Sequence, residues 1–405
     1  MRNQKGSRAL VSLSLAAALA TGGAALAGCS NGKVDPAPTA SPTASQGAEL
    51  KAPRTPTLTP QQSGTANRLQ AISPVNERVV WASGLGGTFA LTTDGGATWR
   101  SRVVPGAEAL QFRDVQGISA KVAYLLAAGV GTDSRIYKTE DGGDTWKLQF
   151  QNEDPNGFYD CFAFWSPDRG ITMADSINGR FPVIQTTDGD TWRDVGPQLP
   201  AALPGEAAFA ASGTCAATQG SKRAWLATVG APKARVLATK NGGKSWAAYE
   251  TPIKGSPSSG AASVAFRDRR HGIVGGGDLN APAALSDNVA RSRDGGKTWQ
   301  LAARSPFPGA IFGLSYALEP NHDDKRNQAD DPEADDVDGH DDARGHDHDR
   351  VTVVATGPGG AAWSPDEGES WVLLDGVINY WAVAFADAHT GWLVGTEGRI
   401  VKLTF

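Results

Sequence analysis

The hydrophobic residues of this chain are gathered in short runs that end at glycine, aspartate or asparagine. One stretch shows the pattern clearly: apolar runs at 158–165, 170–175 and 181–186 flank a turn sequence, Ile-Asn-Gly-Arg, at 177–180. Short apolar or alternating runs bounded by turn residues are typical of β-strands joined by hairpins. The pattern therefore predicts an all-β protein, in which this stretch supplies the first three strands of one sheet.

An eight-residue pattern recurs six times between these runs, and its first copy is Thr-Thr-Asp-Gly-Gly-Ala-Thr-Trp at 92–99. The fourth copy has asparagine in place of the aspartate, and the third, at 186–192, is one residue shorter. The aspartate or asparagine of such a turn accepts hydrogen bonds from nearby backbone N–H groups, and the glycine adopts positive φ. The tryptophan lies on the next strand, where we expect it to enter the core. The repeated positions are Asp94, Asp141, Asp188, Asn241, Asp294 and Asp366, with the tryptophans Trp99, Trp146, Trp192, Trp246, Trp299 and Trp371.

The closing tryptophans are 46 to 54 residues apart, except for a last interval of 72 residues. Intervals of about 40–50 residues are typical of β-propeller blades. The repeat resembles the Asp-box (BNR) repeat, Ser/Thr-x-Asp-x-Gly-x-Thr-Trp, of sialidases, sortilin-type receptors and the photosystem II stability and assembly factor family. This resemblance implies a propeller whose boxes lie at the periphery, away from ligand sites. We therefore interpret the box aspartates as structural and not catalytic.

The chain after the last box provides three further strands, at 381–385, 391–395 and 399–403, with no box and no fourth strand. A closed ring must cover its open strand edges. The segment 56–60, just before the first blade, is able to pair there as the missing outer strand. We therefore predict seven blades closed by both chain ends, with a six-bladed ring as the alternative.

The N-terminus has a basic start and an apolar run that ends in Leu-Ala-Gly before Cys29, which resembles a bacterial lipobox. We expect residues 1–28 to be a lipoprotein signal peptide and Cys29 to carry the lipid anchor. Residues 29–53 are rich in Pro, Ser, Thr and Ala, which predicts a disordered tether. The alternative is a transmembrane anchor, for which the apolar run is shorter than the about 20 residues that span a bilayer. The prediction places the propeller, 54–405, in the cell envelope, on the periplasmic or surface side of a membrane.

Two cysteines lie within the predicted propeller, Cys161 and Cys215. The compartment favours disulfides, so the two thiols either form a bridge or remain as separate buried thiols in their apolar runs. The sequence alone does not decide between them, because the distance between the two Cα atoms determines whether a bridge forms.

The segment 319–350 lacks any strand pattern and contains thirteen acidic and four basic residues. We expect it to be a disordered insertion between the first and second strands of the sixth blade, and it accounts for the long last interval. Imidazole and carboxylate groups suit zinc, nickel or copper, so the candidate metal ligands are His340, His346 and His348. The alternative is a solvated loop, because no spacing fixes a coordination geometry. The net charge of the chain, −5, predicts no nucleic-acid partner.

Propellers bind ligands around the central channel, on the face made by the loops from second to third strands and from outer to next inner strands. The segments 157–165 and 175–180 resemble the best-defined part of this face in bacterial relatives of the assembly-factor family. Their charged residues either bind a ligand or form ion pairs that rigidify one blade. The predicted binding residues of this channel face are Tyr159, Asp160, Asp175, Arg180, Tyr380 and Trp381.

The similarity to the assembly-factor family extends over nearly all of 54–405 and includes Phe-x-Asp-x-x-x-Gly-Trp-x-Val-Gly at 385–395. It implies a non-enzymatic scaffold that docks a protein or ligand on its channel face. For this chain we expect a lipid-anchored monomer, without a cofactor, that binds a protein or glycan partner.

The alternative is a sialidase-like exo-glycosidase or a carbohydrate-binding propeller, because Asp boxes also occur in sialidases. These enzymes use an arginine triad and a tyrosine nucleophile paired with glutamate. The nearest counterparts are Arg180, in the segment Gly-Arg-Phe-Pro, and Tyr380 with Glu397, but the triad cannot be assembled. The chain also lacks a nucleophile elbow, a phosphate-binding loop and a dinucleotide fingerprint, so we do not expect catalysis.

Overall fold

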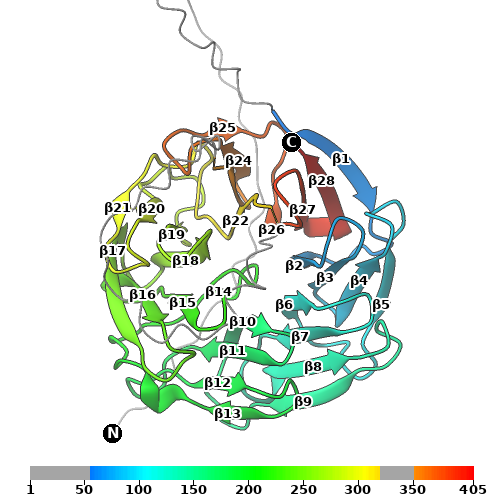
Figure 1. Ribbon diagram of the computed structural model, residues 1–405, viewed down its shortest axis with the longest axis horizontal. Helices are drawn as coiled ribbons and strands as arrows, with labels where there is room; N and C mark the ends of the chain where they lie inside the picture. Colours follow the sequence, from blue (N-terminus) through cyan, green and yellow to red (C-terminus); the bar gives the residue numbers. More distant parts are fainter. Residues whose placement is uncertain (1–54, 320–350) are drawn as a thin grey trace, which may run out of the picture. The chain divides into compact units, whose positions relative to one another are not determined.

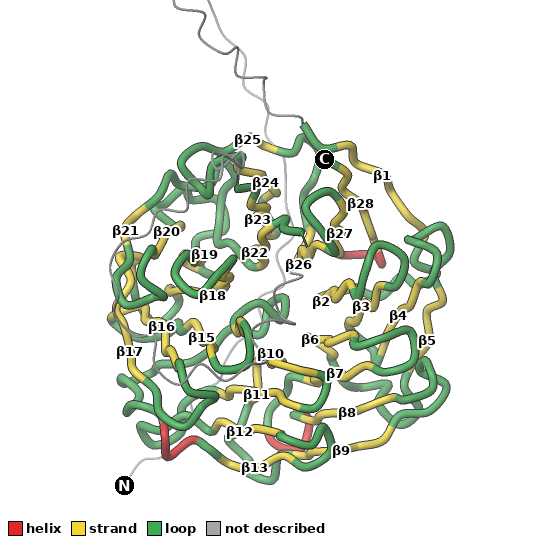
Figure 2. Tube along the Cα trace, viewed as in Figure 1, coloured by secondary structure: helices red, strands yellow, loops and turns green. Residues whose placement is uncertain are grey.

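The computed structural model of the protein describes residues 55–319 and 351–405. Seven four-stranded antiparallel sheets are arranged around a common axis (Figure 1). In six sheets the strand that comes first in the chain is the innermost, and in the seventh the N-terminal strand is the outermost. Apart from three-residue 3-10 turns, the described residues form strands and loops (Figure 2). The seven-bladed propeller predicted from the repeats is therefore confirmed, and the six-bladed alternative is excluded.

The strands of the first four blades run from the innermost to the outermost in chain order. They are β2 (Leu69–Pro74), β3 (Val80–Gly84), β4 (Thr88–Thr92) and β5 (Arg100–Val103) in blade 1, and β6 (Phe112–Gly117), β7 (Ala123–Ala127), β8 (Arg135–Thr139) and β9 (Lys147–Gln151) in blade 2. Blades 3 and 4 contain β10 (Tyr159–Ser166), β11 (Arg169–Ala174), β12 (Val183–Thr186), β13 (Trp192–Asp194), β14 (Ala216–Gln219), β15 (Arg223–Ala227), β16 (Lys233–Thr239) and β17 (Ala247–Lys254).

The last three blades follow the same order until the ring closes. Blades 5 and 6 contain β18 (Ser259–Phe266), β19 (Gly272–Asp278), β20 (Val289–Ser292), β21 (Gln300–Leu301), β22 (Gly313–Tyr316), β23 (Val353–Gly357), β24 (Gly360–Ser364) and β25 (Val372–Leu373). Blade 7 contains β26 (Tyr380–Phe385), β27 (Thr390–Gly395), β28 (Arg399–Thr404) and β1 (Thr57–Gln62). The 3-10 turns are η1 (Gly131–Asp133), η2 (Gly196–Gln198) and η4 (Thr396–Gly398).

The ring is closed by the pairing of β1 with β28, which joins the two ends of the described chain (Figure 1). The register is antiparallel, with Thr57 opposite Thr404 and Gln62 opposite Arg399. Pro60 is tolerated within β1 because this strand lies at the edge of its sheet, where a missing N–H group can face away from the ladder. The closing strand is the segment that the sequence predicted for this place.

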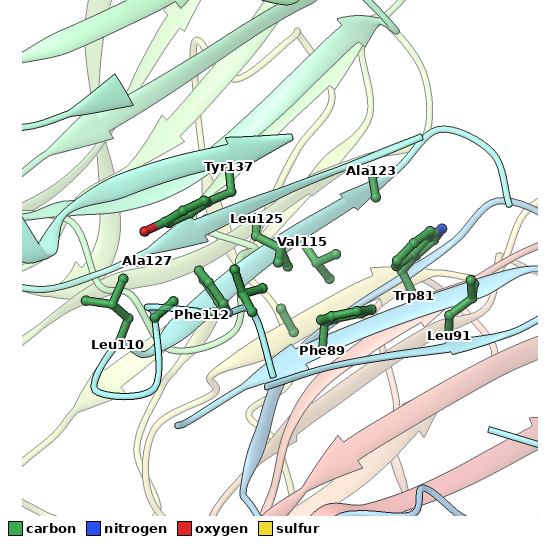
Figure 3. Close-up of a cluster of buried hydrophobic side chains, with 13 residues drawn as sticks. Trp81, Phe89, Leu91, Leu110, Phe112, Val115, Ala123, Leu125, Ala127 and Tyr137 are labelled. Atoms are coloured by element: carbon green, nitrogen blue, oxygen red, sulfur yellow. The ribbon is translucent and has the colours of Figure 1, made fainter. Parts of the chain in front are cut away.

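Neighbouring blades are held together by apolar cores between their sheets, and Figure 3 shows the core between blades 1 and 2. Trp81 and Phe89 come from blade 1, and Phe112 and Leu125 come from blade 2; all four are at most 1% exposed. The box tryptophan of blade 2, Trp146, packs edge-on against Phe89 with ring centroids 5.1 Å apart. The box tryptophan thus connects its own blade to the preceding blade.

Each Asp box is a turn held by its own side chains. In the first box, the Thr92 hydroxyl donates to Asp94 Oδ1 at 2.8 Å, and the Gly96 amide donates to the Thr92 hydroxyl at 2.9 Å. The Thr98 amide donates to Asp94 Oδ1 at 2.9 Å, and the Thr98 hydroxyl donates to Oδ2 at 2.6 Å. These donors, the Thr98 hydroxyl above all, lower the pKa of Asp94 to about 2. The carboxylate is fully engaged in the turn, as a structural group would be.

The fourth box keeps this geometry with an amide in place of the carboxylate. Asn241 Oδ1 accepts the Ser245 amide at 3.0 Å, and Asn241 Nδ2 donates to the Ser245 hydroxyl at 2.8 Å. The hydroxyl now accepts where the equivalent Thr98 hydroxyl donates, so asparagine completes the same ring of hydrogen bonds without charge.

Several predicted features lie outside the described residues: the signal peptide 1–28, the lipid-bearing Cys29, the tether 29–53, and all of the insertion 319–350 except Glu319. The undescribed stretch 320–350 connects β22 to β23, the first two strands of blade 6. Within residues 55–319 and 351–405, no helix has the length and apolar character needed to cross a membrane.

Candidate functional site

In five blades, the pairing between the innermost strand and the second strand is irregular close to where the innermost strand begins. The register shifts there leave one residue of the inner strand without a partner on the second strand. Such β-bulges redirect a side chain and often occur next to binding sites. The unpaired residues are Gln70, Arg113, Asp160, Ala262 and Trp381.

Arginine and aromatic side chains meet at this end of the channel, which we call the vestibule. The Arg68 guanidinium lies 4.2 Å from the centroid of the Trp381 ring, and Arg113 lies 5.8 Å from that of Phe158. Phe312 connects this group to Phe209, with ring centroids 5.0 Å from Trp381 and 5.1 Å from Phe209. The vestibule comprises Arg68, Gln70, Arg113, Phe158, Asp160, Phe209, Phe312 and Trp381.

The floor of the vestibule is a segment that crosses the channel, residues 209–214, which we call the plug. It directly precedes Cys215 and the inner strand β14, which lies near the centre of the ring in Figure 1. The Ala210 carbonyl accepts a hydrogen bond from Arg113 Nη1 at 3.2 Å, and the Ala210 amide donates to Asp160 Oδ1 at 3.1 Å. The plug thus connects blades 2 and 3 at this end.

The far end of the plug reaches blades 5 and 6. The Ser212 hydroxyl donates to the Phe312 carbonyl, and the Thr214 hydroxyl lies 2.8 Å from the Ser263 hydroxyl. A cavity of about 460 Å³ lies beyond the plug, lined by Ser212, Gly213 and Thr214 and by the later residues of the inner strands. The plug therefore separates the vestibule from this cavity, which lies on the side of the ring that carries the Asp boxes.

The plug is fixed by a disulfide at its C-terminal end. Cys215 follows the plug directly and is bonded to Cys161, with the two Cα atoms 6.0 Å apart. Cys161 is the neighbour of Asp160 in β10, and both cysteines are buried. Of the two alternatives that the sequence left open, the structure contains the bridge.

Burial governs the charges of the vestibule. Burial lowers the pKa of Arg68. Burial, followed by repulsion from the charge of Arg68, lowers the pKa of Arg113. Asp160 is 2% exposed, and burial followed by the charge of Asp175 raises the pKa of its carboxyl well above the usual range. The vestibule therefore presents two neighbouring guanidinium groups beside a carboxyl whose ionised form is disfavoured.

Four buried polar atoms of the vestibule have no hydrogen-bond partner among the described residues. They are Nε of Arg68, Oε1 of Gln70, Oδ2 of Asp160 and Nε1 of Trp381. Unpaired buried polar atoms are rare in folded proteins, because each costs about 1–3 kcal/mol. The nitrogens of Arg68 and Trp381 are donors and Oε1 of Gln70 is an acceptor, so a ligand that carries both kinds of group would satisfy them.

The structure divides the six predicted binding residues among three places. Asp160 and Trp381 lie in the vestibule, and Asp175 lies close enough to influence Asp160. Tyr159 and Arg180 line a separate cleft between blades 2 and 3.

Tyr380 is 6% exposed in the core near the last two blades, where Arg399 lies 5.3 Å from its ring centroid. Arg180 in blade 3 and Tyr380 in blade 7 were the counterparts considered for a sialidase-like site. The structure does not bring these two side chains together.

The predicted binding residues did not include the other six residues of the vestibule: Arg68, Gln70, Arg113, Phe158, Phe209 and Phe312. Arg68 and Phe312 directly precede inner strands, a position that the strand pattern is able to identify. Phe209 lies in the long connection from β13 to β14, and no periodic signal marks its entry into the channel.

Within residues 55–319 and 351–405, no group of three or more histidine, cysteine, aspartate or glutamate side chains is arranged to hold a metal ion. The candidate ligands His340, His346 and His348 lie outside these ranges. Their role in metal binding stays a prediction.

Comparison with known proteins agrees with this architecture. The BNR/Asp-box repeat family matches residues 290–301, which contain the fifth box. No curated protein matches the sequence.

Solved structures with the same fold include YCF48 bound to D1 peptide, with a TM-score of 0.57 and 13% identity over 87% of this chain and 96% of that chain. YCF48 from Cyanidioschyzon merolae has a TM-score of 0.54 and 16% identity over 86% of this chain and 98% of that chain. A streptogramin B lyase has a TM-score of 0.58 and 12% identity over 86% of this chain and 97% of that chain. At such identities the likeness concerns the fold alone. The chain is thus a seven-bladed β-propeller with BNR/Asp-box repeats, similar in fold to the photosystem II assembly factor YCF48.

Proposed function

We propose that the protein is a non-enzymatic scaffold of the cell envelope that binds a peptide segment of a protein partner in its vestibule. The observation that carries the proposal is the set of unpaired buried donors and acceptors beside two guanidinium groups. A binding site is concave and largely apolar, with a few polar groups that fix the ligand. The vestibule supplies the aromatic side chains and the few polar groups of such a site, next to the plug.

A peptide matches the polar groups of the vestibule in kind. Its carbonyl oxygens accept from donors such as Arg68 Nε and Trp381 Nε1, and its amides donate to acceptors such as Gln70 Oε1. The two arginines, Arg68 and Arg113, favour a segment that carries carboxylate groups. Phe209 and Phe312 offer rings on which apolar side chains can pack.

The comparison with YCF48 supports a protein partner, since a propeller of this fold has been solved with a D1 peptide. The low identity carries neither the peptide sequence nor a photosynthetic role to this chain. The location in the envelope rests on the signal-peptide pattern and the lipobox before Cys29. A role without catalysis agrees with the separation of Arg180 from Tyr380.

The proposal can be tested by selecting peptides from a displayed random library on the purified protein and measuring their affinities by fluorescence anisotropy. Enriched peptides should be acidic, and Arg68→Gln or Arg113→Gln should lower the affinity for each peptide by about tenfold or more. The control variant is Arg180→Gln, which lies in another cleft and should leave the affinity unchanged. Circular dichroism checks that each variant is folded. Peptides that bind the double variant of Arg68 and Arg113 as tightly as the natural protein would refute the proposal.

A further inference from the structure

A second cavity, of about 810 Å³, lies away from the channel, between the outer strand of blade 2 and the outer part of blade 3. We call it the interblade cleft. The strands that form it, β9, β12 and β13, lie near one another at the rim of the ring in Figure 1. Its charged and aromatic residues are Phe150, Glu153, Asp154, Tyr159, Arg180, Phe181, Trp192 and Asp194.

Aromatic rings form part of the cleft wall. Tyr159 is 4% exposed and meets Phe150 edge-on, with ring centroids 5.1 Å apart. The half-buried Trp192 donates its indole N–H to Gln149 at 3.3 Å, which fixes the orientation of its ring. Phe150 and Trp192, which are only partly buried, therefore offer rigid ring surface to the cleft at a low cost in side-chain entropy.

The Tyr159 hydroxyl makes no hydrogen bond within the described part of the chain, although the residue is almost completely buried. Burial, followed by the charges of Asp194 and Asp154, raises the pKa of this hydroxyl. The group thus remains protonated at neutral pH and is available as a donor.

Two of the carboxylates, those of Asp154 and Asp194, are each held in place through one oxygen. Asp194 Oδ1 accepts the Gly196 amide at 2.8 Å, and Asp154 Oδ1 accepts the Asn156 amide at 2.9 Å. The second oxygen of each makes no hydrogen bond to a described residue, so both present an acceptor to a ligand.

Arg180 supplies the opposite charge. It closes a tight turn in which Ile177 and Arg180 exchange backbone hydrogen bonds of 2.8 and 3.1 Å. Its side chain is exposed and makes no ion pair with a described residue. The cleft thus contains fixed acceptors, a protonated hydroxyl donor and a guanidinium donor around aromatic rings.

The charges of the cleft disfavour anionic ligands, because the carboxylates of Glu153, Asp154 and Asp194 outnumber the single guanidinium in its lining. A hydroxyl group can instead donate to the carboxylates and accept from Tyr159 and Arg180. Neutral sugars carry many such hydroxyls and have apolar ring faces that stack on aromatic side chains. We propose that the interblade cleft binds a neutral oligosaccharide, independently of the peptide site in the vestibule.

The test uses the full mature chain, an array of neutral and charged glycans, and calorimetric titration of the glycans that bind. At least one neutral oligosaccharide should bind. Tyr159→Phe should weaken its binding about three- to tenfold, because it removes only the hydroxyl, and Asp194→Asn about tenfold or more. Asparagine still accepts the Gly196 amide, so the second variant keeps the local turn.

The control Arg113→Gln alters the vestibule and should leave glycan affinity unchanged, whereas the cleft variants should leave peptide affinity unchanged. The failure of one site is therefore distinguishable from the failure of the other. Three results would overturn the inference: no neutral glycan binds, only charged glycans bind, or affinity is the same in the double variant of Tyr159 and Asp194.

Discussion

The disulfide between Cys161 and Cys215 should account for a large share of the stability of the propeller. It closes a loop of 54 residues, and the loop-entropy relation gives about 4 kcal/mol of stabilisation for that length at room temperature. The free energy of unfolding of a typical domain is about 5–15 kcal/mol. Both cysteines are almost fully buried, so reduction requires opening of the core.

The assay is urea unfolding followed by the fluorescence of the 12 tryptophans, for the oxidised protein, the reduced protein and the Cys161→Ala, Cys215→Ala double variant. The reduced protein and the variant should each lose about 4 kcal/mol, and alanine adds a smaller cavity cost. Reductant should not change the variant, which serves as the control. If the oxidised and reduced proteins have the same free energy of unfolding, the reasoning is refuted.

Further predictions concern the plug, the buried ion pair between Glu206 and Arg235, and the boxes. Gly213→Ala should lower the free energy of unfolding by about 2 kcal/mol or more, because φ is +78° and the added methyl carbon would lie 2.2 Å from Asp114 Oδ1; unchanged urea unfolding would contradict this. Glu206→Ala should cost about 3–5 kcal/mol, because it leaves the guanidinium of Arg235 buried without its partner; thermal unfolding checks it, and a loss below 1 kcal/mol would contradict it. The box aspartates, with a pKa of about 2 at Asp94, should stabilise the fold above the unfolded pKa of 3.8, and this contribution should disappear as the pH falls toward 2.

The acid prediction has a control within the chain, since the fourth box contains Asn241 and does not titrate. Asp94→Asn should therefore preserve the turn and reduce the slope of stability against pH between about 4 and 2. An unchanged slope in this variant would show that the box carboxylate is not linked to folding.

The repeats made the fold predictable, because every box marks the end of a blade's third strand and every tryptophan begins the fourth or directly precedes it. The closing strand was predictable too, since three strands without a fourth leave an open edge. The candidate site was harder to predict from the sequence. Tyr159 and Asp160 are neighbours in the sequence, but Asp160 lies at a β-bulge, so Tyr159 lines the interblade cleft and Asp160 lies in the vestibule.

Tyr380 and Trp381 are separated in the same way, one in the core and the other in the vestibule. Both pairs lie at β-bulges, which interrupt the regular alternation of a strand, and the strand pattern of the sequence does not mark them. The sequence does not mark the plug either. Residues 209–214 contain no strand pattern, and their place is set by hydrogen bonds to partners as distant in sequence as Gln70 and Phe312.

The most direct test of a peptide-binding vestibule is photo-crosslinking in the native cells. Benzoylphenylalanine replaces Phe209 at the vestibule floor or, as the control, Leu301 on the exposed outer strand β21. The vestibule position should give a covalent adduct with a protein partner that Arg113→Gln diminishes, and the outer position should give none. Adducts from Leu301 alone, or adducts at Phe209 that are insensitive to Arg113→Gln, would contradict the proposed function.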